Sequence, residues 1–275
     1  MRSHFIPSRT ALACAVSSAT VAALLPSVSS AAVIAADFAT NPTYAGGWSA
    51  GQNGGFGFGA WSFNGTDMTP AGVYQGMTSS SSIGTSWTLF THSGNSGLAN
   101  AGRAIPGGLQ AGQMFETVIQ NPTGYNFFRG FDILFTGGPD NNVPGDNTAA
   151  LRLSVFNYFA SNWSLNDSGG GTGTGLSSLT TGAAGVKIDL TLTSATSYSL
   201  TMTPLNGGPV YNHSGTLAGP VNWVDYRLWD GASDGPNDTA NNFEINQMTI
   251  STIPEPGTLA LLGLGLGVVF LRRHK

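Results

Sequence analysis

The chain has 275 residues, with 14 acidic residues against 10 Lys and Arg. Five of the basic residues lie at the two ends of the chain, which leaves 13 acidic and 5 basic residues between Asp37 and Thr252. Nucleic acids and anionic membrane surfaces bind clustered cations, so this composition argues against both as partners.

The first 32 residues have the features of a secretory signal peptide. Arg2 and Arg9 form a basic start, Ala11 to Leu25 is an apolar stretch of small residues, and Ser29 to Ala32 supplies small residues for cleavage. We expect cleavage between Ser30 and Ala36, with the best position after Ala32. The remaining chain has no cysteine, so an exported domain here must be stable without disulfides.

Residues 37–252 alternate apolar and polar side chains, which predicts β-strands rather than helices. The clearest case is the pair of runs at 186–192 and 198–203, separated by the turn-like Ser194-Ala195, which predicts a hairpin. Further strands are predicted at 56–63, 83–90, 114–120, 127–135, 150–159, 221–229 and 243–250. Glycine-rich clusters separate them, and we expect the cluster at 168–175 to be a flexible hairpin loop. About ten short strands predict an all-β, antiparallel two-sheet sandwich.

Residues 253–275 form a tail of three parts. Pro254, Glu255 and Pro256 interrupt regular structure, because proline fixes φ and lacks a backbone donor. The uncharged stretch at 258–271 follows, and Arg272 and Arg273 lie near the end of the sequence. Fourteen helical residues span about 21 Å, less than the roughly 30 Å of a hydrocarbon core. A permanent anchor would usually be longer, so we predict a short transmembrane helix that belongs to a sorting signal. An ordinary membrane anchor is the alternative interpretation.

This order of parts resembles the PEP-CTERM sorting signal of Gram-negative bacterial surface proteins. The resemblance implies that the tail holds the exported protein in the inner membrane until an exosortase, a transpeptidase-like membrane enzyme, processes it. The body also resembles a group of PEP-CTERM proteins, through the segments 54–61, 98–109, 198–203 and 242–250. That resemblance implies a concanavalin-like jelly-roll sandwich. Most members of the group have no assigned activity, so the resemblance implies a fold more than a function.

The acidic residues of the predicted strands do not have the spacing of a polysaccharide hydrolase. Such enzymes need two carboxyl groups about 5 Å or about 6.5–9.5 Å apart, which usually come from alternate positions of one strand. Glu116, Glu244, Asp132 and Asp189 are each alone on their predicted strands. We therefore expect a protein without catalytic residues. A secreted polysaccharide-active enzyme is the alternative hypothesis.

Two candidate binding sites follow from the sequence. The first is the glycine-rich segment 230–238, where Asp230, Asp234 and Asp238 offer oxygen ligands suited to calcium. The same residues also suit a solvated turn, and their spacing matches no EF-hand. We expect no other cofactor.

The second candidate is a glycan site at Trp223 and Trp229, which share one face of a predicted strand. Flat aromatic rings stack on sugars, but six tryptophans in one domain are also expected as core residues. Val224, Tyr226 and Leu228 occupy the other face of the strand. The alternation alone leaves open which of the two faces is buried.

Together these features predict a non-catalytic exported surface or extracellular-matrix protein with glycan binding as a candidate activity. The expected partners are the secretion machinery, an exosortase and the exopolysaccharide of a biofilm. The expected location is the inner membrane during sorting, and then the cell surface or matrix.

Overall fold

The computed structural model describes residues 30–63, 73–91, 97–121, 129–139, 151–158, 161–177, 183–230 and 242–254. These ranges contain fifteen strands and one short 3-10 helix, η1 (Pro42–Tyr44), and the strands form two antiparallel sheets. The all-β, antiparallel jelly-roll sandwich predicted from the sequence is therefore confirmed. No helix within the described ranges is long and apolar enough to span a membrane. The apolar stretches of the predicted signal peptide and transmembrane segment lie outside those ranges.

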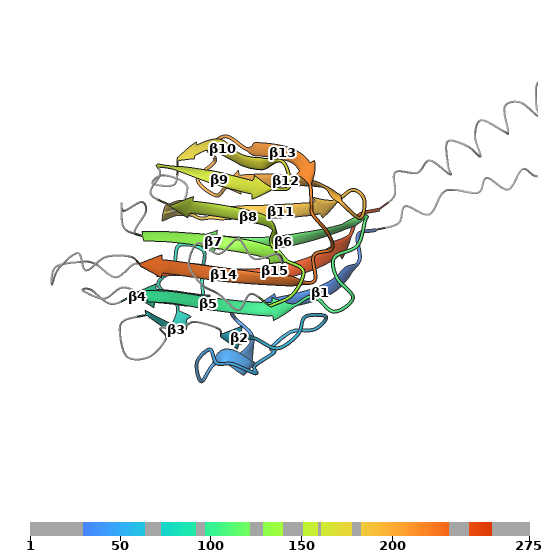
Figure 1. The fold of residues 1–275 in the computed structure, drawn as a ribbon. Helices are drawn as coiled ribbons and strands as arrows, with labels where there is room; N and C mark the ends of the chain where they lie inside the picture. The colour runs from blue at the N-terminus through green and yellow to red at the C-terminus, as the bar shows by residue number, and fades with distance from the viewer. Residues whose placement is uncertain are drawn as a thin grey trace, which may run out of the picture. The chain divides into compact units, whose positions relative to one another are not determined.

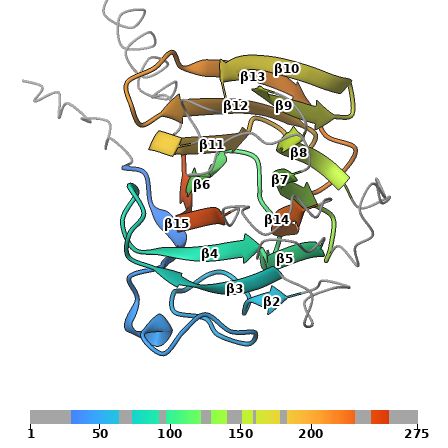
Figure 2. The ribbon, with the colours of Figure 1, turned by 90° about the vertical axis from the view of Figure 1, so that its left-hand side faces the viewer.

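Sheet A has eight strands, and seven of them lie side by side in a single row (Figures 1 and 2). In spatial order these are β13 (Tyr211–Thr216), β12 (Ser197–Pro204), β11 (Val186–Leu192), β6 (Gln113–Gln120), β15 (Asn242–Thr252), β4 (Ser86–Thr91) and β3 (Val73–Thr78). The eighth strand, β1 (Val33–Phe38), pairs with residues 247–251 of β15. Strand β4 pairs with residues 242–245 of the same strand.

Sheet B has seven strands, which lie one below another in Figure 1. They are β10 (Gly170–Ser177), β9 (Asn162–Asp167), β8 (Leu151–Tyr158), β7 (Arg129–Thr136), β14 (Trp223–Asp230), β5 (Gly97–Ala104) and β2 (Ser62–Phe63). Figure 2 shows the two sheets as separate layers, with β6 and β15 in one and β7 and β14 in the other.

The hairpin of β11 and β12 follows the predicted alternation. Leu190 lies opposite Leu200, and every second residue of both strands is buried between the sheets. The intervening Thr, Ser, Lys and Asp residues occupy the other face, which we call the outer face of the sheet. Period two in the sequence therefore marks the two faces of a half-buried strand.

Two predicted segments have a different structure from the one expected. Residues 56–63 are mostly loop, with one bridge between Phe56 and Ala36 and the short strand β2. Glycines allow this loop to lie against β1, since a Cβ on Gly55 would be 1.8 Å from the Ala36 carbonyl oxygen. The glycine-rich segment predicted as a loop instead forms most of β10, at the edge of sheet B, because edge pairing needs only backbone groups.

Six strands are absent from the prediction, namely β1, β3, β5, β9, β10 and β13. Several are rich in glycine or small polar residues, so their alternation is weak; β5 reads Gly-Leu-Ala-Asn-Ala-Gly-Arg-Ala. The first of them, β1, extends the sandwich to Val33, where the sequence suggested a start at residue 37.

A group of aromatic rings fills one end of the core. Trp61 contacts Trp48 and Trp87 edge to face, with ring centroids 4.9 and 5.1 Å apart, and Tyr44 packs on Trp87 at 5.2 Å. All four side chains are buried. Edge-to-face pairs of this kind stabilise a core beyond the area that they bury.

A buried ion pair joins β1 to β5 beside these rings. The Arg103 guanidinium donates to Asp37, to the Gly59 carbonyl oxygen at 2.7 Å and to Asn53 Oδ1 at 2.6 Å. It also lies over the Trp61 ring at 4.7 Å. This one side chain therefore holds the loop after β1 against the sandwich.

Candidate functional site

Strand β14 lies in the middle of sheet B, between β7 and β5. Val224, Tyr226 and Leu228 are fully buried between the sheets. Trp223 therefore lies on the outer face, which answers the question that the alternation left open. The Trp229 side chain is outside the described part of the structure.

An ion pair joins β14 to β7 on this outer face. Arg227 lies directly opposite Asp132 and donates to both of its carboxylate oxygens, with Nε 2.8 Å from Oδ1. Asp132 is 1 % exposed and Arg227 is 9 % exposed. A two-pronged pair of this kind holds a carboxylate in one orientation.

The neighbouring end of β14 carries an aromatic ring next to a carboxylate. Trp223 is half-buried, and its Nε1 donates to Asp225 Oδ1 at 2.8 Å. Gly102 lies opposite Asp225 on β5, and a Cβ there would be 1.9 Å from that oxygen. The absence of a side chain at Gly102 therefore makes room for the Trp223 and Asp225 pair.

Asn100 is the residue of β5 opposite Arg227. It is completely buried, and neither of its amide atoms has a hydrogen-bond partner among the described residues. Together with Trp223, Asp225, Arg227 and Asp132 it forms what we call the β14 face. This surface combines a half-buried ring with buried donors and acceptors, the combination that fixes a polar ligand beside an aromatic side chain. Asn100, Asp132 and Arg227 come from strands far apart in sequence, and no local motif marks them.

Two acids that are solitary in the sequence are neighbours in sheet A. Glu116 and Asp189 lie opposite each other on the outer face, and Lys187 Nζ contacts both, at 3.4 and 2.7 Å. Burial raises the pKa of Asp189, with Lys187 opposing and Glu116 adding to the effect. Each carboxylate is thus already engaged by a cation.

Glu244 is buried on the same outer face, and this burial raises its pKa. It pairs with Gln120, four residues along β6 from Glu116, which corresponds to about 13 Å. That separation exceeds the spacing of a hydrolase pair. Among the described residues, the two folded-body glutamates therefore do not face each other across a scissile bond.

Four of the six tryptophans are core residues, as their number in one domain suggested. Trp48, Trp61, Trp87 and Trp163 are at most 3 % exposed, and Trp163 packs on Phe131. Trp223 is the half-buried exception among the described tryptophans.

The calcium prediction lies largely outside the described residues. Asp230 ends β14, but its side chain, together with Asp234 and Asp238, belongs to the part that is not described. Within the described ranges, no group of three His, Cys, Asp or Glu side chains is placed to hold a metal ion. Calcium binding at 230–238 stays a prediction.

The folded body ends where the predicted sorting tail begins. Strand β15 ends at Thr252, and the Ile253 amide donates to the Gly112 carbonyl oxygen at 2.7 Å. Pro254 follows immediately. Glu255, Pro256, Arg272 and Arg273 lie outside the described residues.

Residues 252–274 match the family model of the PEP-CTERM protein-sorting motif. The chain therefore carries this sorting motif directly after its last strand. Comparison with curated proteins found no match to the sequence.

Solved structures with a similar fold share little sequence with this chain. A protein of unknown function from Shewanella oneidensis is 10 % identical, with a TM-score of 0.50, over 82 % of this chain and 88 % of its own. A legume lectin-like domain from Entamoeba histolytica is 9 % identical, with a TM-score of 0.45, over 70 % and 90 % of the two chains. Lectin II from Ulex europaeus is 10 % identical, with a TM-score of 0.42, over 70 % and 92 %. The Shewanella protein supports the sandwich fold alone.

Proposed function

We propose that this chain is an exported surface or matrix protein whose PEP-CTERM tail directs its sorting and whose sandwich is a non-catalytic binding module. The observation that carries the proposal is the sorting motif at 252–274, which starts at the last residue of β15. The tail is thus attached to a folded domain with no flexible linker between the final strand and Pro254. In this proposal the tail enters the inner membrane, and an exosortase processes the chain near Pro-Glu-Pro.

Alanine substitution of the motif tests the sorting proposal. Replacement of Pro254, Glu255 and Pro256 together should leave the protein in the membrane fraction with the mass of the unprocessed tail. A matched control, Gly257→Ala with Thr258→Ala, changes the adjacent tail residues and should be processed normally. Mass spectrometry and surface labelling of the host cells measure both. Unchanged mass and surface delivery in the triple variant would mean that the motif does not direct sorting.

We further propose that the binding module recognises glycan of the surrounding exopolysaccharide through the β14 face. Support comes from the half-buried Trp223 ring, whose Nε1 is already oriented by Asp225. An oriented ring loses little side-chain freedom when a sugar stacks on it.

Retention of the detergent-solubilised chain on the host's own exopolysaccharide tests this second proposal. Trp223→Ala should weaken retention about fivefold to tenfold, which corresponds to the roughly 1 kcal/mol of an aromatic contact. Phe38→Ala is the matched control, because it removes another partly exposed ring, 42 % exposed, on β1 in sheet A. Equal retention of the two variants would argue against glycan binding at the β14 face.

The proposal that the module is non-catalytic rests on its carboxylates. Asp132 is paired with Arg227, and Glu116 and Asp189 share Lys187. A hydrolase needs one acid free to give up a proton and a second free to attack or to activate water. Release of reducing sugar from the same exopolysaccharide by the purified chain would contradict this part of the proposal.

A further inference from the structure

The two described ends of the body leave the sandwich at the same place. The Ala32 amide donates to Thr252 Oγ1 at 3.1 Å, and Val33 lies opposite Ser251 in the pairing of β1 with β15. Figure 1 shows β1 and β15 side by side at this position. We call this part of the molecule the tail end.

Apolar side chains are exposed at the tail end. Val33 is 55 % exposed, Ile34 is 40 % exposed and Ile253 is 39 % exposed. They come from the first strand and from the residue after the last strand. Their exposure leaves an apolar surface directly around the point where the chain continues into its tail.

The described loops around this surface carry no charge. Residues 105–112 lead into β6, residues 193–196 join β11 to β12, and residues 217–222 lead into β14. Hydrogen bonds tie them together, from Gly112 to Leu192 and from Leu109 to Val221. None of the three segments contains Asp, Glu, Lys, Arg or His. The three segments are therefore uncharged themselves, although the Arg152 side chain of β8 lies against Gly219 in the last of them. Strand β14 finishes at Asp230, at the other end of its sheet.

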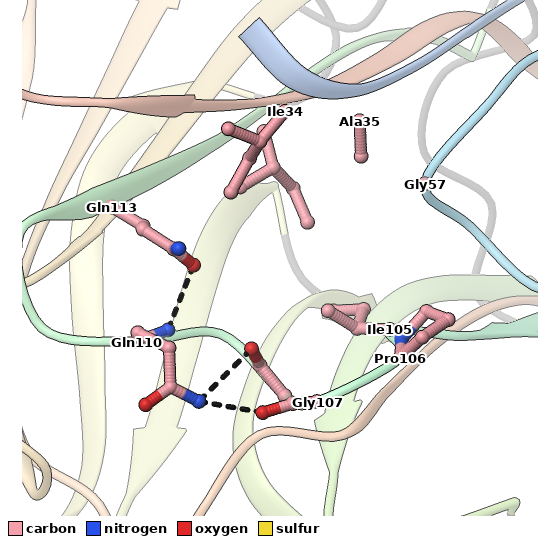
Figure 3. Close-up of a pocket in the computed structure, with 10 residues that line it drawn as sticks. Ile34, Ala35, Gly57, Ile105, Pro106, Gly107, Gln110 and Gln113 are labelled. Carbon is pink, nitrogen blue, oxygen red and sulfur yellow. Dashed lines mark hydrogen bonds between the residues drawn. The ribbon is translucent and has the colours of Figure 1, made fainter. Parts of the chain in front are cut away.

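A small pocket opens beside Ile34 at the same end (Figure 3). It has a volume of about 190 Å³, with Ile34, Ile105 and Ile250 among its lining residues. Gln110 Nε2 donates to the Gly107 carbonyl oxygen at 2.6 Å, and the Gln110 amide donates to Gln113 Oε1 at 2.9 Å. The Gln110 amide groups and Gln113 Oε1 are thus occupied within the loop.

The length of chain between the body and the apolar stretch limits how far the tail end can be from a membrane. Ile253 is tied to Gly112, so only the four residues 254–257 separate it from the stretch that begins at Thr258. Four extended residues reach at most about 14 Å. Each headgroup layer of a bilayer is roughly 6 Å thick, so about 8 Å of reach remains beyond it.

We infer that the tail end of the sandwich docks on the bilayer, with Val33, Ile34 and Ile253 in contact with lipid, while the tail is inserted. This inference rests on the proposed membrane insertion of the tail. The apolar stretch is shorter than the hydrocarbon core, and a short stretch draws its flanking residues towards the membrane. The three side chains of the contact are apolar, so the contact does not depend on clustered cations. Docking would present Pro254, Glu255 and Pro256 at headgroup level, where a membrane enzyme can reach them.

Fluorescent labelling at the two ends of the sandwich tests the inference in the chain without residues 1–32, because the apolar stretch of the predicted signal peptide would bind the vesicles by itself. Val33→Cys reports on the tail end, and Val210→Cys is its matched control. Val210 is also an exposed valine, 51 % exposed, but it lies between β12 and β13 at the other end of the sandwich. Residues 33–275 contain no cysteine of their own, so each variant carries a single thiol. The labelled chains are reconstituted into phosphatidylcholine vesicles with a doxyl-labelled lipid as quencher, and flotation shows whether the chain is membrane-bound.

We expect the probe at residue 33 to shift its emission to the blue and to be quenched several-fold more strongly than the probe at 210. Added salt should not change this difference, because the contact is apolar. Equal hydration of both probes in floated vesicles would overturn the docking inference while leaving tail insertion intact. If the probe at 33 shifts to the blue but is not quenched by the doxyl-labelled lipid, the docking inference is overturned, and a second protein molecule covers this surface instead. Failure of the chain to float would instead overturn the proposed membrane insertion, and the docking inference with it.

Discussion

Replacement of Asp37 by Asn should destabilise the sandwich severely, because it leaves the Arg103 charge buried. Both side chains are 0 % exposed, and the Tyr44 hydroxyl also donates to the Asp37 carboxylate. Removal of one partner from a buried pair costs about 3–5 kcal/mol. In a domain of this size each kcal/mol lowers Tm by about 2–4 °C, so we expect a loss on the order of 10 °C.

The matched control is the same substitution in a partly exposed pair. Asp189 contacts Lys187 at 2.7 Å, but the Lys187 side chain is 33 % exposed. Partly exposed pairs contribute less than about 1 kcal/mol, so Asp189→Asn should lower Tm by no more than about 4 °C. Thermal unfolding followed by circular dichroism measures both variants under one condition. Similar losses in the two variants would refute the reasoning that burial determines the cost.

A double-mutant cycle separates the ion pair from other effects of the substitution. Arg103→Met alone should also destabilise, since it leaves the carboxylate buried without its cation. Asp37→Asn combined with Arg103→Met should cost clearly less than the two single losses added together. Additivity within about 0.5 kcal/mol would mean that the two groups are not coupled.

Three further results are expected from the packing of the sandwich. Gly102→Ala should lower the free energy of unfolding by about 1–3 kcal/mol, because the added methyl group overlaps Asp225 on the β14 face. Gly173→Ala places its methyl group in open space and should change this free energy little, and urea unfolding compares the two variants. Burial, and then the hydrogen bond to a carboxylate, raises the pKa of Tyr44 from 10.0 to about 12. The protonated Tyr44 hydroxyl therefore contributes its full stability below about pH 10, and this contribution is lost as the pH rises towards 12. In Tm measured against pH, Tyr44→Phe should show a smaller loss over this alkaline range. Trp87→Ala should cost about 3–5 kcal/mol, and chemical unfolding should show a much smaller loss for the partly exposed Phe38→Ala.

Long alternating strands were predictable from the sequence because their pattern is local. The prediction of 186–192 matches β11 to the residue, and 198–203 lies within β12. Strands with few large side chains were not predictable in this way. In β10 the backbone pairs with β9 although Gly170, Gly171 and Gly173 carry no side chain that would mark a face.

The candidate site was predictable only in part. Trp223 was identified from its place on an alternating strand, and the structure decides what the alternation left open, since Trp223 lies away from the core. Asp132 was noted as a solitary acid, and its pairing with Arg227, 95 residues later, follows from the order of β7 and β14. No spacing in the sequence reports such a distant pairing.

The sequence by itself determined the class of fold and the order of the sorting tail, because alternation, proline breaks and terminal charge are properties of neighbouring residues. Only the tertiary structure decided which face of β14 is buried, since both faces of that strand carry large side chains. It also decided that Asp37 and Arg103 meet in the core, and that Val33 lies opposite Ser251, close to the end of the last strand. The physical reason is the same in each case: a strand's partners are chosen by sheet pairing and by the burial of apolar area across the whole domain, which no short stretch of sequence contains.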